Sequence, residues 1–402
     1  MKGLSIIFGL WLLTQNVFAS GDWVFASRTP VTAQASVAVF HHLEGAGRKH
    51  IALSQQTLAV VWEDDHSGSP QIYITYKALA GERFSAAQSV SSGTEAYEPA
   101  VTGLSGNRFA MTWEQDGAVF LRSAYDQQLS PALKLSEAAG SHASIASFAN
   151  SAYVVWREQR ATGWSLWVAV IAVAADGQLT LTGKNRIEAE DIASTLLFPA
   201  IAANSTGLVV AWEDRRAGHT RLNYSFSHNH GAAFSPPKYL NEFYSNRNQY
   251  DKGSGVTRVA LSSYAQNEFL AAWMDKRRGN NGYGIFAAQA YDGSFGPDEK
   301  VHSAQGDELA HNNPATSGNA RGDFVVVWDD FRAGNSDIWI SRYTEDSVWS
   351  EDISPAPASG SGEQTHAAVA LDEEGGLHLL WIERETVDAP SRLWYSLGSM
   401  RE

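Results

Sequence analysis

Short runs of β-branched and aromatic residues alternate with polar turns along most of the chain. Residues 324–328 (FVVVW) have the composition of a buried strand, because branched and aromatic side chains fit a pleated sheet. Residues 329–336 are mostly polar and contain a glycine and an asparagine, which suit a tight turn. Residues 337–342 again alternate between apolar and polar side chains. This pattern predicts two antiparallel strands joined by a short turn.

The strand–turn–strand pattern occurs seven times, and each copy carries one tryptophan near the end of its first strand. These tryptophans are 43 to 61 residues apart and are Trp62, Trp113, Trp156, Trp212, Trp273, Trp328 and Trp381. A repeat of this length in an all-β sequence is typical of β-propellers. We therefore predict an all-β fold, a single seven-bladed β-propeller. Six or eight blades are the alternatives, because the copies around Trp113 and Trp156 are weaker.

Two further strands flank most copies and predict four-stranded antiparallel blades. A segment of small residues such as 98–101 comes before the copy and suits an innermost strand, where neighbouring blades crowd around the axis. A more polar segment such as 84–90 follows and suits the outer strand. The predicted blades are residues 49–95, 96–138, 139–192, 193–243, 244–305, 306–356 and 357–402.

The two ends of the chain complement one another. The last copy stops after its third strand, at residues 393–397, and a spare segment at residues 23–40 precedes the first copy. If this segment adds an outer strand to the last blade, the ring closes without an unpaired edge. We therefore predict that an N-terminal outer strand within residues 20–48 closes the propeller.

The composition and the N-terminal segment limit the classes of function that we expect for the protein. Residues 1–19 look like a secretory signal peptide, with Lys2 followed by an apolar stretch at 4–13 and a small-residue cleavage site at Ala19. The chain has no cysteine, which excludes disulfides and thiol catalysis, and its formal charge of −14 disfavours nucleic acid and anionic membranes. We expect an exported bacterial protein, periplasmic, secreted or at the cell surface, without a nucleic-acid partner or membrane insertion.

An acid follows most of the repeat tryptophans by two residues, and an arginine follows four of them by four residues. Acid and arginine flank one turn, where they can pair and bind its backbone amides. Because the motif recurs in most blades, we interpret it as structural. The acids are Asp64, Glu158, Asp214, Asp275, Asp330 and Glu383, and the arginines are Arg160, Arg216, Arg277 and Arg332.

This repeat, Trp-(Asp/Glu)-Asp-x-Arg-x-Gly before an Ile-Tyr strand, resembles that of bacterial exported propellers, and it is similar to the sialidase-type propellers. The sialidase-type propellers carry the Asp-box motif, Ser-x-Asp-x-Gly-x-x-Trp. Residues 227–234 (SHNHGAAF) resemble it, with Asn229 in place of the aspartate and Phe234 in place of the tryptophan. The resemblance covers nearly the whole chain and implies the propeller fold, with any active face opposite the Asp-box turns.

Residues that open the inner strands are expected at one face of the ring, where propellers bind ligands over the axis. They differ between blades, as recognition of one ligand requires, and include groups for acid–base chemistry and for neutralising an anion. They are His50, Glu98, Ser141 or His142, Phe198, Arg258, Asn313 and His366. An insertion at residues 237–256 adds Tyr244, Arg247 and Tyr250, which suit a glycan or peptide. The alternative is a rim of solvated residues around a water-filled channel.

The chain contains none of the common catalytic, metal or cofactor motifs that we searched for. These are a Gly-x-Ser-x-Gly elbow, a Walker loop, a His-Glu-x-x-His pair and a dinucleotide fingerprint. The segment before the sixth blade carries His302, Asp307, Glu308 and His311, but their spacing fits no known ligand pattern. We predict no metal and no cofactor.

Three functions fit these features. The first is a non-catalytic exported propeller that binds a glycan or protein at the face just described. The second is a carbohydrate-active enzyme, either a sialidase-like hydrolase or a polysaccharide lyase, with its site at the channel mouth. The third is a scaffold within an envelope complex. The repeated, chemically plain motif favours the first.

Overall fold

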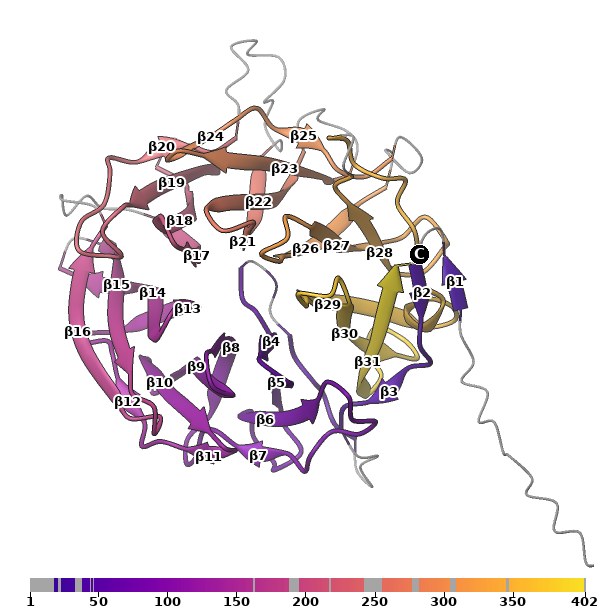
Figure 1. Cartoon of the computed structure of the whole chain (residues 1–402), viewed down its shortest axis with the longest axis horizontal. Coiled ribbons are helices and arrows are strands. Elements are labelled where there is room, and N and C mark those ends of the chain that lie inside the picture. The colour runs from indigo at the N-terminus through magenta and orange to yellow at the C-terminus, as the bar shows by residue number, and fades with distance from the viewer. Residues whose placement is uncertain are drawn as a thin grey trace, which may run out of the picture.

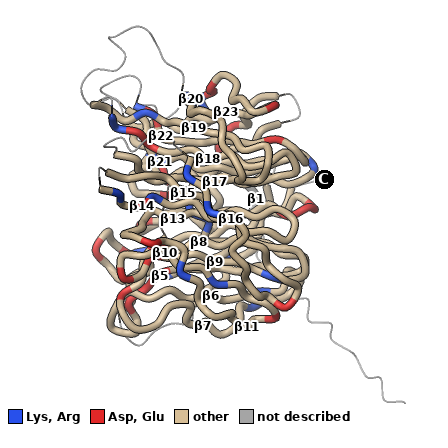
Figure 2. Tube along the Cα trace, turned by 90° about the vertical axis from the view of Figure 1, so that its left-hand side faces the viewer, with Lys and Arg blue, Asp and Glu red and all other residues tan. Residues whose placement is uncertain are grey.

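The computed structural model describes residues 18–20, 23–32, 38–43, 45, 47–161, 163–187, 195–216, 218–241, 255–276, 282–303, 309–344 and 347–400. These residues form seven antiparallel sheets arranged around a central axis, which confirms the seven-bladed propeller (Figure 1). Viewed edge-on, Asp and Glu gather mostly in the loops at the two faces of the ring (Figure 2). In the described part of the chain, no helix has the length and apolarity needed to cross a bilayer.

The first four blades follow the chain from the axis outward. Blade 1 contains β4 (Ile51–Ser54), β5 (Thr57–Asp64), β6 (Gln71–Ala78) and β7 (Gln88–Ser89). Blade 2 contains β8 (Ala96–Leu104), β9 (Arg108–Gln115), β10 (Ala118–Tyr125), β11 (Gln128–Leu129) and β12 (Leu133–Lys134). Blade 3 contains β13 (Gly140–Phe148), β14 (Ser151–Arg160), β15 (Gly163–Val173) and β16 (Leu179–Arg186). Blade 4 contains β17 (Leu196–Asn204), β18 (Gly207–Asp214), β19 (Arg221–Ser227) and β20 (Lys238–Tyr239).

The remaining blades vary in their outer strand. Blade 5 contains β21 (Val256–Tyr264), β22 (Glu268–Asp275), β23 (Gly284–Tyr291), β24 (Ser294–Phe295) and β25 (Glu299–Lys300). Blade 6 contains β26 (His311–Gly318), β27 (Phe324–Asp330) and β28 (Asp337–Arg342), with single bridges from Ile340 to Ile353 and from Tyr343 to Trp349 at its outer edge. A 3₁₀ turn, η1 (Ala356–Ala358), leads to blade 7, which contains β29 (Glu363–Leu371), β30 (Leu377–Arg384) and β31 (Ser391–Met400).

The N-terminal segment completes blade 7, as predicted. β2 (Trp23–Phe25) and β3 (Thr29–Pro30) both pair antiparallel with β31, and β1 (Phe18–Ser20) pairs with β2. Arg28, which follows β2, forms an ion pair with Glu383 and lies 4.4 Å from the ring centroid of Trp394. Both chain ends therefore contribute to one sheet, and the edge of β31 is covered.

The repeat tryptophans form the contacts between blades. Each is at most 2% exposed and lies in an apolar cluster shared with the preceding blade. Trp273 of blade 5, for example, shares a cluster with Ala200 and Leu222 of blade 4. Since the same large side chain fills every interface, the repeat builds the ring rather than a single special site.

Candidate functional site

Each inner strand of blades 2 to 7 begins with a β-bulge at the same register position. In blade 2, Tyr97 pairs with Glu114 and Ala100 pairs with Thr112, so residues 98 and 99 are left between two ladder positions. The first bulge residue of all six blades has φ between +48° and +60° although none is glycine, and we call these residues the mouth ring: Glu98, His142, Phe198, Arg258, Asn313 and His366. All six are partly exposed. Six of the predicted opening residues, all except His50, thus share one position in the fold.

At four of the six mouth-ring positions, a carboxyl group from the preceding blade holds the left-handed backbone. Each carboxylate directly follows a repeat tryptophan and accepts a hydrogen bond from a mouth-ring backbone N–H: Glu63 from Glu98 at 3.0 Å, Glu114 from His142 at 2.5 Å, Glu213 from Arg258 at 3.0 Å and Asp329 from His366 at 2.9 Å. A non-glycine residue in this conformation is unfavourable by itself, and the hydrogen bond to the carboxyl group offsets part of that cost.

Blade 3 replaces this carboxylate with an arginine, and a histidine takes over the contact. Arg157 follows Trp156 and donates from Nε to Ser141 Oγ at 2.8 Å. The N–H of Phe198 instead donates to Nδ1 of His142, 3.1 Å away. Because Nδ1 accepts this bond, the neutral imidazole of His142 carries its proton on Nε2.

Three mouth-ring side chains from consecutive blades form a stack. The rings of His142 and Phe198 are nearly parallel, 3° apart in plane and 4.3 Å between centroids. The guanidinium carbon of Arg258 lies 4.2 Å from the centroid of Phe198. This arrangement joins an aromatic surface to a cation, a combination suited to the apolar faces and anionic groups of a sugar acid. Another arginine–aromatic pair, Arg157 and Trp164 at 4.1 Å, lies in blade 3.

Blade 1 departs from the bulge pattern. His42 pairs with Glu63, and the backbone carbonyl of His50 accepts a hydrogen bond from Val61 N–H, so the connection between these two positions is longer than the two bulge residues of the other blades. Its described part, which we call the axial plug, comprises Leu43, Gly45 and residues 47–49. The segment before β4 reaches the middle of the ring (Figure 1).

The axial plug contacts the inner strands around it. The carbonyl of Gly47 accepts a hydrogen bond from Ser144 Oγ of blade 3 at 2.8 Å, and that of Lys49 accepts one from Val101 N–H of blade 2 at 2.7 Å. An added Cβ on Gly47 would lie 2.4 Å from Ala200 Cβ of blade 4, so glycine is required there. Between the axial plug and the inner strands of blades 5, 6 and 7 lies a cavity with a volume of about 20 Å³, about the space of one water molecule.

Charges of the plug and the mouth ring compensate one another. The guanidinium of Arg48 forms an ion pair with Glu98 and lies 3.6 Å from Glu114. Burial and the nearby charge of Glu98 raise the pKa of Glu114 to about 8. Glu98, one of the predicted ligand-binding residues, is thus engaged with Arg48.

The other predicted site residues are placed as follows. His50 is 2% exposed and its Nδ1 lies 3.2 Å from the carbonyl of Val61, so it is not part of the mouth ring. Asn313 donates to Asp329 at 2.7 Å, and the ring of His366 lies 6.3 Å from that of His42. Tyr244, Arg247 and Tyr250 lie outside the described residues. A role of these residues in ligand binding stays a prediction.

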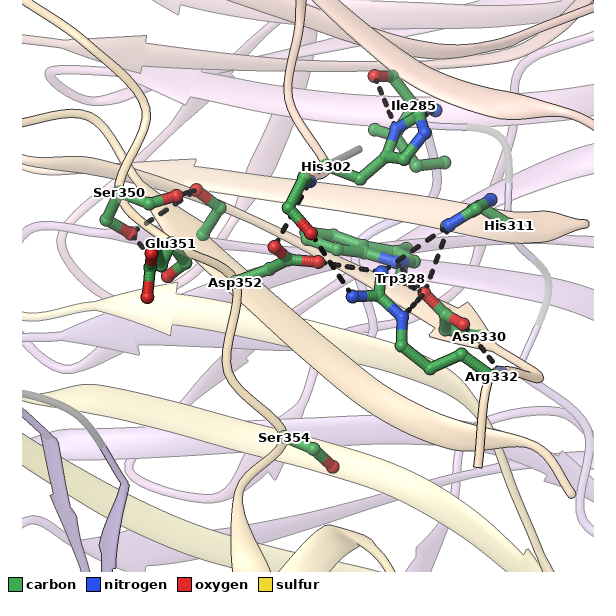
Figure 3. Close-up of polar contacts among 12 residues, drawn as sticks. Ile285, His302, His311, Trp328, Asp330, Arg332, Ser350, Glu351, Asp352 and Ser354 are labelled. Carbon is green, nitrogen blue, oxygen red and sulfur yellow. Dashed lines mark hydrogen bonds and ion pairs between the residues drawn. The ribbon is translucent and has the colours of Figure 1, made fainter. Parts of the chain in front are cut away.

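The repeat motif around Asp330 is a closed network (Figure 3). Asp330 accepts hydrogen bonds from the indole of Trp328 at 3.1 Å and from the backbone N–H of Arg332 at 2.9 Å. The guanidinium of Arg332 lies 2.5 Å from Asp330 and 2.7 Å from Asp352. Burial opposes ionisation of Asp330, but bonds from His311 and Arg332 hold its pKa well below the usual range.

Equivalent contacts recur in other blades and support the structural interpretation of the motif. The indole of Trp62 donates to Asp64 at 2.6 Å and that of Trp156 to Glu158 at 3.0 Å. Arg160 pairs with Glu158 at 3.1 Å, and Arg216 donates from Nε to Asp214 at 2.8 Å. Arg277 lies outside the described residues.

The two histidines considered as metal ligands make protein contacts. The rings of His302 and His311 lie 4.1 Å apart, and Nε2 of His311 faces Asp330 at 3.2 Å. Nδ1 of His302 accepts from the N–H of Ile285 at 3.2 Å. Asp307 and Glu308 lie outside the described residues, and the described residues contain no group of three or more His, Asp or Glu arranged to hold a metal.

Sequence reasoning missed the axial plug and the carboxylates that follow the tryptophans. Glu63, Glu114, Glu213 and Asp329 repeat at one position, which was the available signal for the carboxylates. For the plug, the signal was the glycine pair at 45 and 47 in front of the first inner strand.

The sequence matches no protein-family model, and no curated protein matches it. Several solved structures resemble the chain. A protein of unknown function from Dyadobacter fermentans is 10% identical over 95% of this chain and 100% of its own, with a TM-score of 0.54. The endosialidase of phage phi92 is 9% identical over 93% of this chain and 69% of its own, with a TM-score of 0.50. An α-L-arabinofuranosidase of Fusarium graminearum is 10% identical over 93% and 97%, with a TM-score of 0.49. At these identities the likeness is one of fold, and the chain shares the propeller fold of sialidase-like proteins.

Proposed function

We propose that the protein is an exported, non-catalytic propeller that binds a glycan or a protein ligand at the face of the mouth ring. The observation that carries this proposal is the axial plug. Sugar hydrolysis on a propeller axis needs a pocket deep enough to enclose a sugar ring and its catalytic groups. Here the axial plug leaves a cavity of about 20 Å³ between itself and the inner strands of blades 5, 6 and 7, and Arg48 of the plug pairs with Glu98 and lies beside Glu114.

The surface that remains around the plug suits recognition. The stack of His142, Phe198 and Arg258 is partly exposed, and it offers ring faces beside one cation. The backbone under two of these residues is fixed by Glu114 and Glu213, so the side chains are positioned before a ligand arrives. Such preorganisation lowers the entropic cost of binding. A ligand with a carboxylate and a sugar ring, such as an acidic glycan, matches this surface best.

Export is part of the proposal and rests on the signal-peptide pattern at residues 1–19. Residues 1–17 lie outside the described part of the chain, whereas Phe18 and Ala19 belong to β1. Cleavage after Ala19 would shorten β1 and leave β2 at the edge of blade 7. Since β2 and β3 make the direct contacts with β31, the closure of the ring does not depend on β1.

A glycan array combined with a polysaccharide-degradation screen tests the proposal on the purified mature protein. We expect specific retention of one acidic glycan class without release of sugar products. Release of unsaturated or reducing sugars by the wild type, abolished by Arg258→Ala, would instead establish the carbohydrate-active enzyme. Retention that is unchanged by both Phe198→Ala and Arg258→Ala would place the ligand elsewhere.

A further inference from the structure

Another cavity lies on the face opposite the mouth ring, between blades 4 and 5, and we call it the opposite-face pocket. Its volume is about 140 Å³, compared with about 20 Å³ for the cavity beside the axial plug. A cavity of roughly 150 Å³ accommodates a six-membered ring such as benzene. The pocket is lined by the apolar residues Phe226 and Phe269 and by the polar residues Thr206, His228, Asn267 and Asp292.

The pocket forms where the turn after the third strand of a blade meets the preceding blade. Elsewhere this turn packs directly on its neighbour. In blade 3, the carbonyl of Gly177 accepts a hydrogen bond from Ser123 Oγ of blade 2. In blade 4, an added Cβ on Gly231 would lie 2.9 Å from Val170 of blade 3. In blade 5, by contrast, an added Cβ on Gly293 would meet only the imidazole of His228, at 2.9 Å. The open space is therefore particular to the contact between blades 4 and 5 among these three.

The pocket combines a fixed apolar floor with polar groups that are available to a ligand. Phe226 and Phe269 are 4% and 2% exposed and meet edge to face, with their ring centroids 5.8 Å apart. The side chains of His228, Asn267 and Asp292 are exposed and make no hydrogen bond or ion pair with another described residue. Water satisfies these groups in the free protein, and the hydroxyl groups of a ligand can take the place of that water.

The charge of the pocket separates it from the mouth ring. Its described lining contains one carboxylate, Asp292, and no Lys or Arg. Lys238 of blade 4 is engaged with Ser294 Oγ, 3.1 Å away. An anionic ligand is therefore disfavoured here, whereas the mouth ring offers the guanidinium of Arg258 beside Phe198.

We propose that the opposite-face pocket binds the six-membered ring of a neutral sugar. This site is independent of an acidic glycan at the mouth ring. The apolar face of the sugar ring would lie on Phe226 and Phe269, while Asp292 accepts hydrogen bonds from hydroxyl groups and Asn267 both donates and accepts. A mostly apolar wall with a few polar groups that fix orientation is the usual composition of a small-molecule site.

Ligand-observed NMR titration of the mature protein with the methyl glycosides of glucose, galactose, mannose and N-acetylglucosamine tests the proposal. We expect at least one of them to bind the wild type, and Asp292→Asn to weaken its Kd at least about tenfold, because a charged acceptor is lost. Asp126→Asn is the matched control and should leave the Kd unchanged. Asp126 is the exposed residue that follows β10 as Asp292 follows β23, with φ of +47° against +49°, and it does not line the pocket. Asparagine tolerates this conformation, so both variants should fold.

The proposal fails if none of the four glycosides binds the wild type, or if the Asp292 and Asp126 variants have the same affinity. Binding of benzylamine in place of the glycosides would make the pocket a cation site and would also contradict it. A wild-type crystal soaked in the glycoside that binds provides a second measurement that does not depend on a variant. Density for the sugar ring over Phe226 and Phe269 is the expected result, and density at the mouth ring alone would overturn the proposal.

Discussion

Oε1 of Glu213 in blade 4 accepts a hydrogen bond from the backbone N–H of Arg258 in blade 5 at a distance of 3.0 Å. Glu213 directly follows the repeat tryptophan of its blade, and Arg258 is the mouth-ring residue of the next. The same oxygen also accepts from Thr257 Oγ1 at 2.5 Å. The structural repeat of one blade thus positions a variable residue of its neighbour, so the symmetric scaffold supports an asymmetric surface.

Removal of the Asp330 carboxylate should destabilise the ring without affecting ligand binding. Asp330 holds Trp328 and Arg332 and is fully buried. We expect Asp330→Ala to lower the free energy of unfolding by roughly 1–3 kcal/mol, measured by urea denaturation. Glu82→Ala, at an exposed turn of blade 1, should change it by less than about 0.5 kcal/mol. Loss of ligand binding in Asp330→Ala at unchanged stability would show that the motif is a site.

Deletion of residues 18–32 should destabilise the whole ring, because it removes β2 and β3 and exposes the edge of β31. The melting temperature of the deletion variant measures this effect. A deletion of residues 18–20 alone is the control and should leave the melting temperature nearly unchanged. If the longer deletion also melts at the wild-type temperature, the ring does not need its N-terminal strand.

Alanine variants of two glycines distinguish a steric clash in the axial plug from backbone strain alone. Gly47 and Gly68 both have positive φ, +79° and +96°, so alanine is unfavourable at either position. Only at Gly47 would the new Cβ meet another atom, Ala200 Cβ at 2.4 Å, whereas nothing lies within 4 Å at Gly68. We expect Gly47→Ala to be the more destabilising by roughly 1–3 kcal/mol in chemical denaturation. Equal losses would mean that the plug is loosely packed.

Asp329 gives the stability of the ring a dependence on pH. Burial raises its pKa from 3.8 to about 7, against the hydrogen bonds from Asn313 and the backbone of His366. The folded state therefore binds the proton of the Asp329 carboxyl group more tightly than the unfolded state does. The contribution of this proton to the free energy of unfolding is complete below about pH 4 and is lost as the pH rises through 7. Asp329→Asn removes this dependence. The difference in unfolding free energy, wild type minus variant, should fall by an amount on the order of 1–4 kcal/mol between pH 4 and pH 7. A difference that is constant across this range would contradict the raised pKa.

The sequence predicted the parts of the fold that are repeated and local. Seven tryptophans spaced 43 to 61 residues apart indicated seven blades, and a missing strand at one end with a spare segment at residues 23–40 indicated closure. In the structure, β2 and β3 within this segment pair with β31. The positions of the mouth-ring residues followed from alignment of the blades on their tryptophans. His50 was misplaced by this alignment, because the longer connection in blade 1 shifts its register.

The axial plug depends on contacts between residues far apart in sequence. Ser144 and Ala200 fix the position of Gly47 although they lie in blades 3 and 4. The repeat pattern does not distinguish Ser144 or Ala200 from their equivalents in other blades, since small and polar residues occur on every inner strand. Packing around a common axis becomes visible only when all the blades are assembled.

The most direct test of the account is the binding of the retained glycan by a double variant, which we call the mouth-face variant. It combines Arg258→Ala in the mouth ring with Arg247→Ala in the insertion at residues 237–256, whose role in binding is a prediction from the sequence. Its affinity is measured by titration calorimetry at a temperature where it is folded. The account predicts a Kd at least about tenfold weaker than that of the wild type, which corresponds to roughly 1.4 kcal/mol. It also predicts an unchanged Kd for the control variant Arg83→Ala with Arg321→Ala, which removes two exposed arginines near turns of the opposite face. Wild-type affinity in the mouth-face variant, or weakened binding in the control, would contradict a ligand site at the mouth ring.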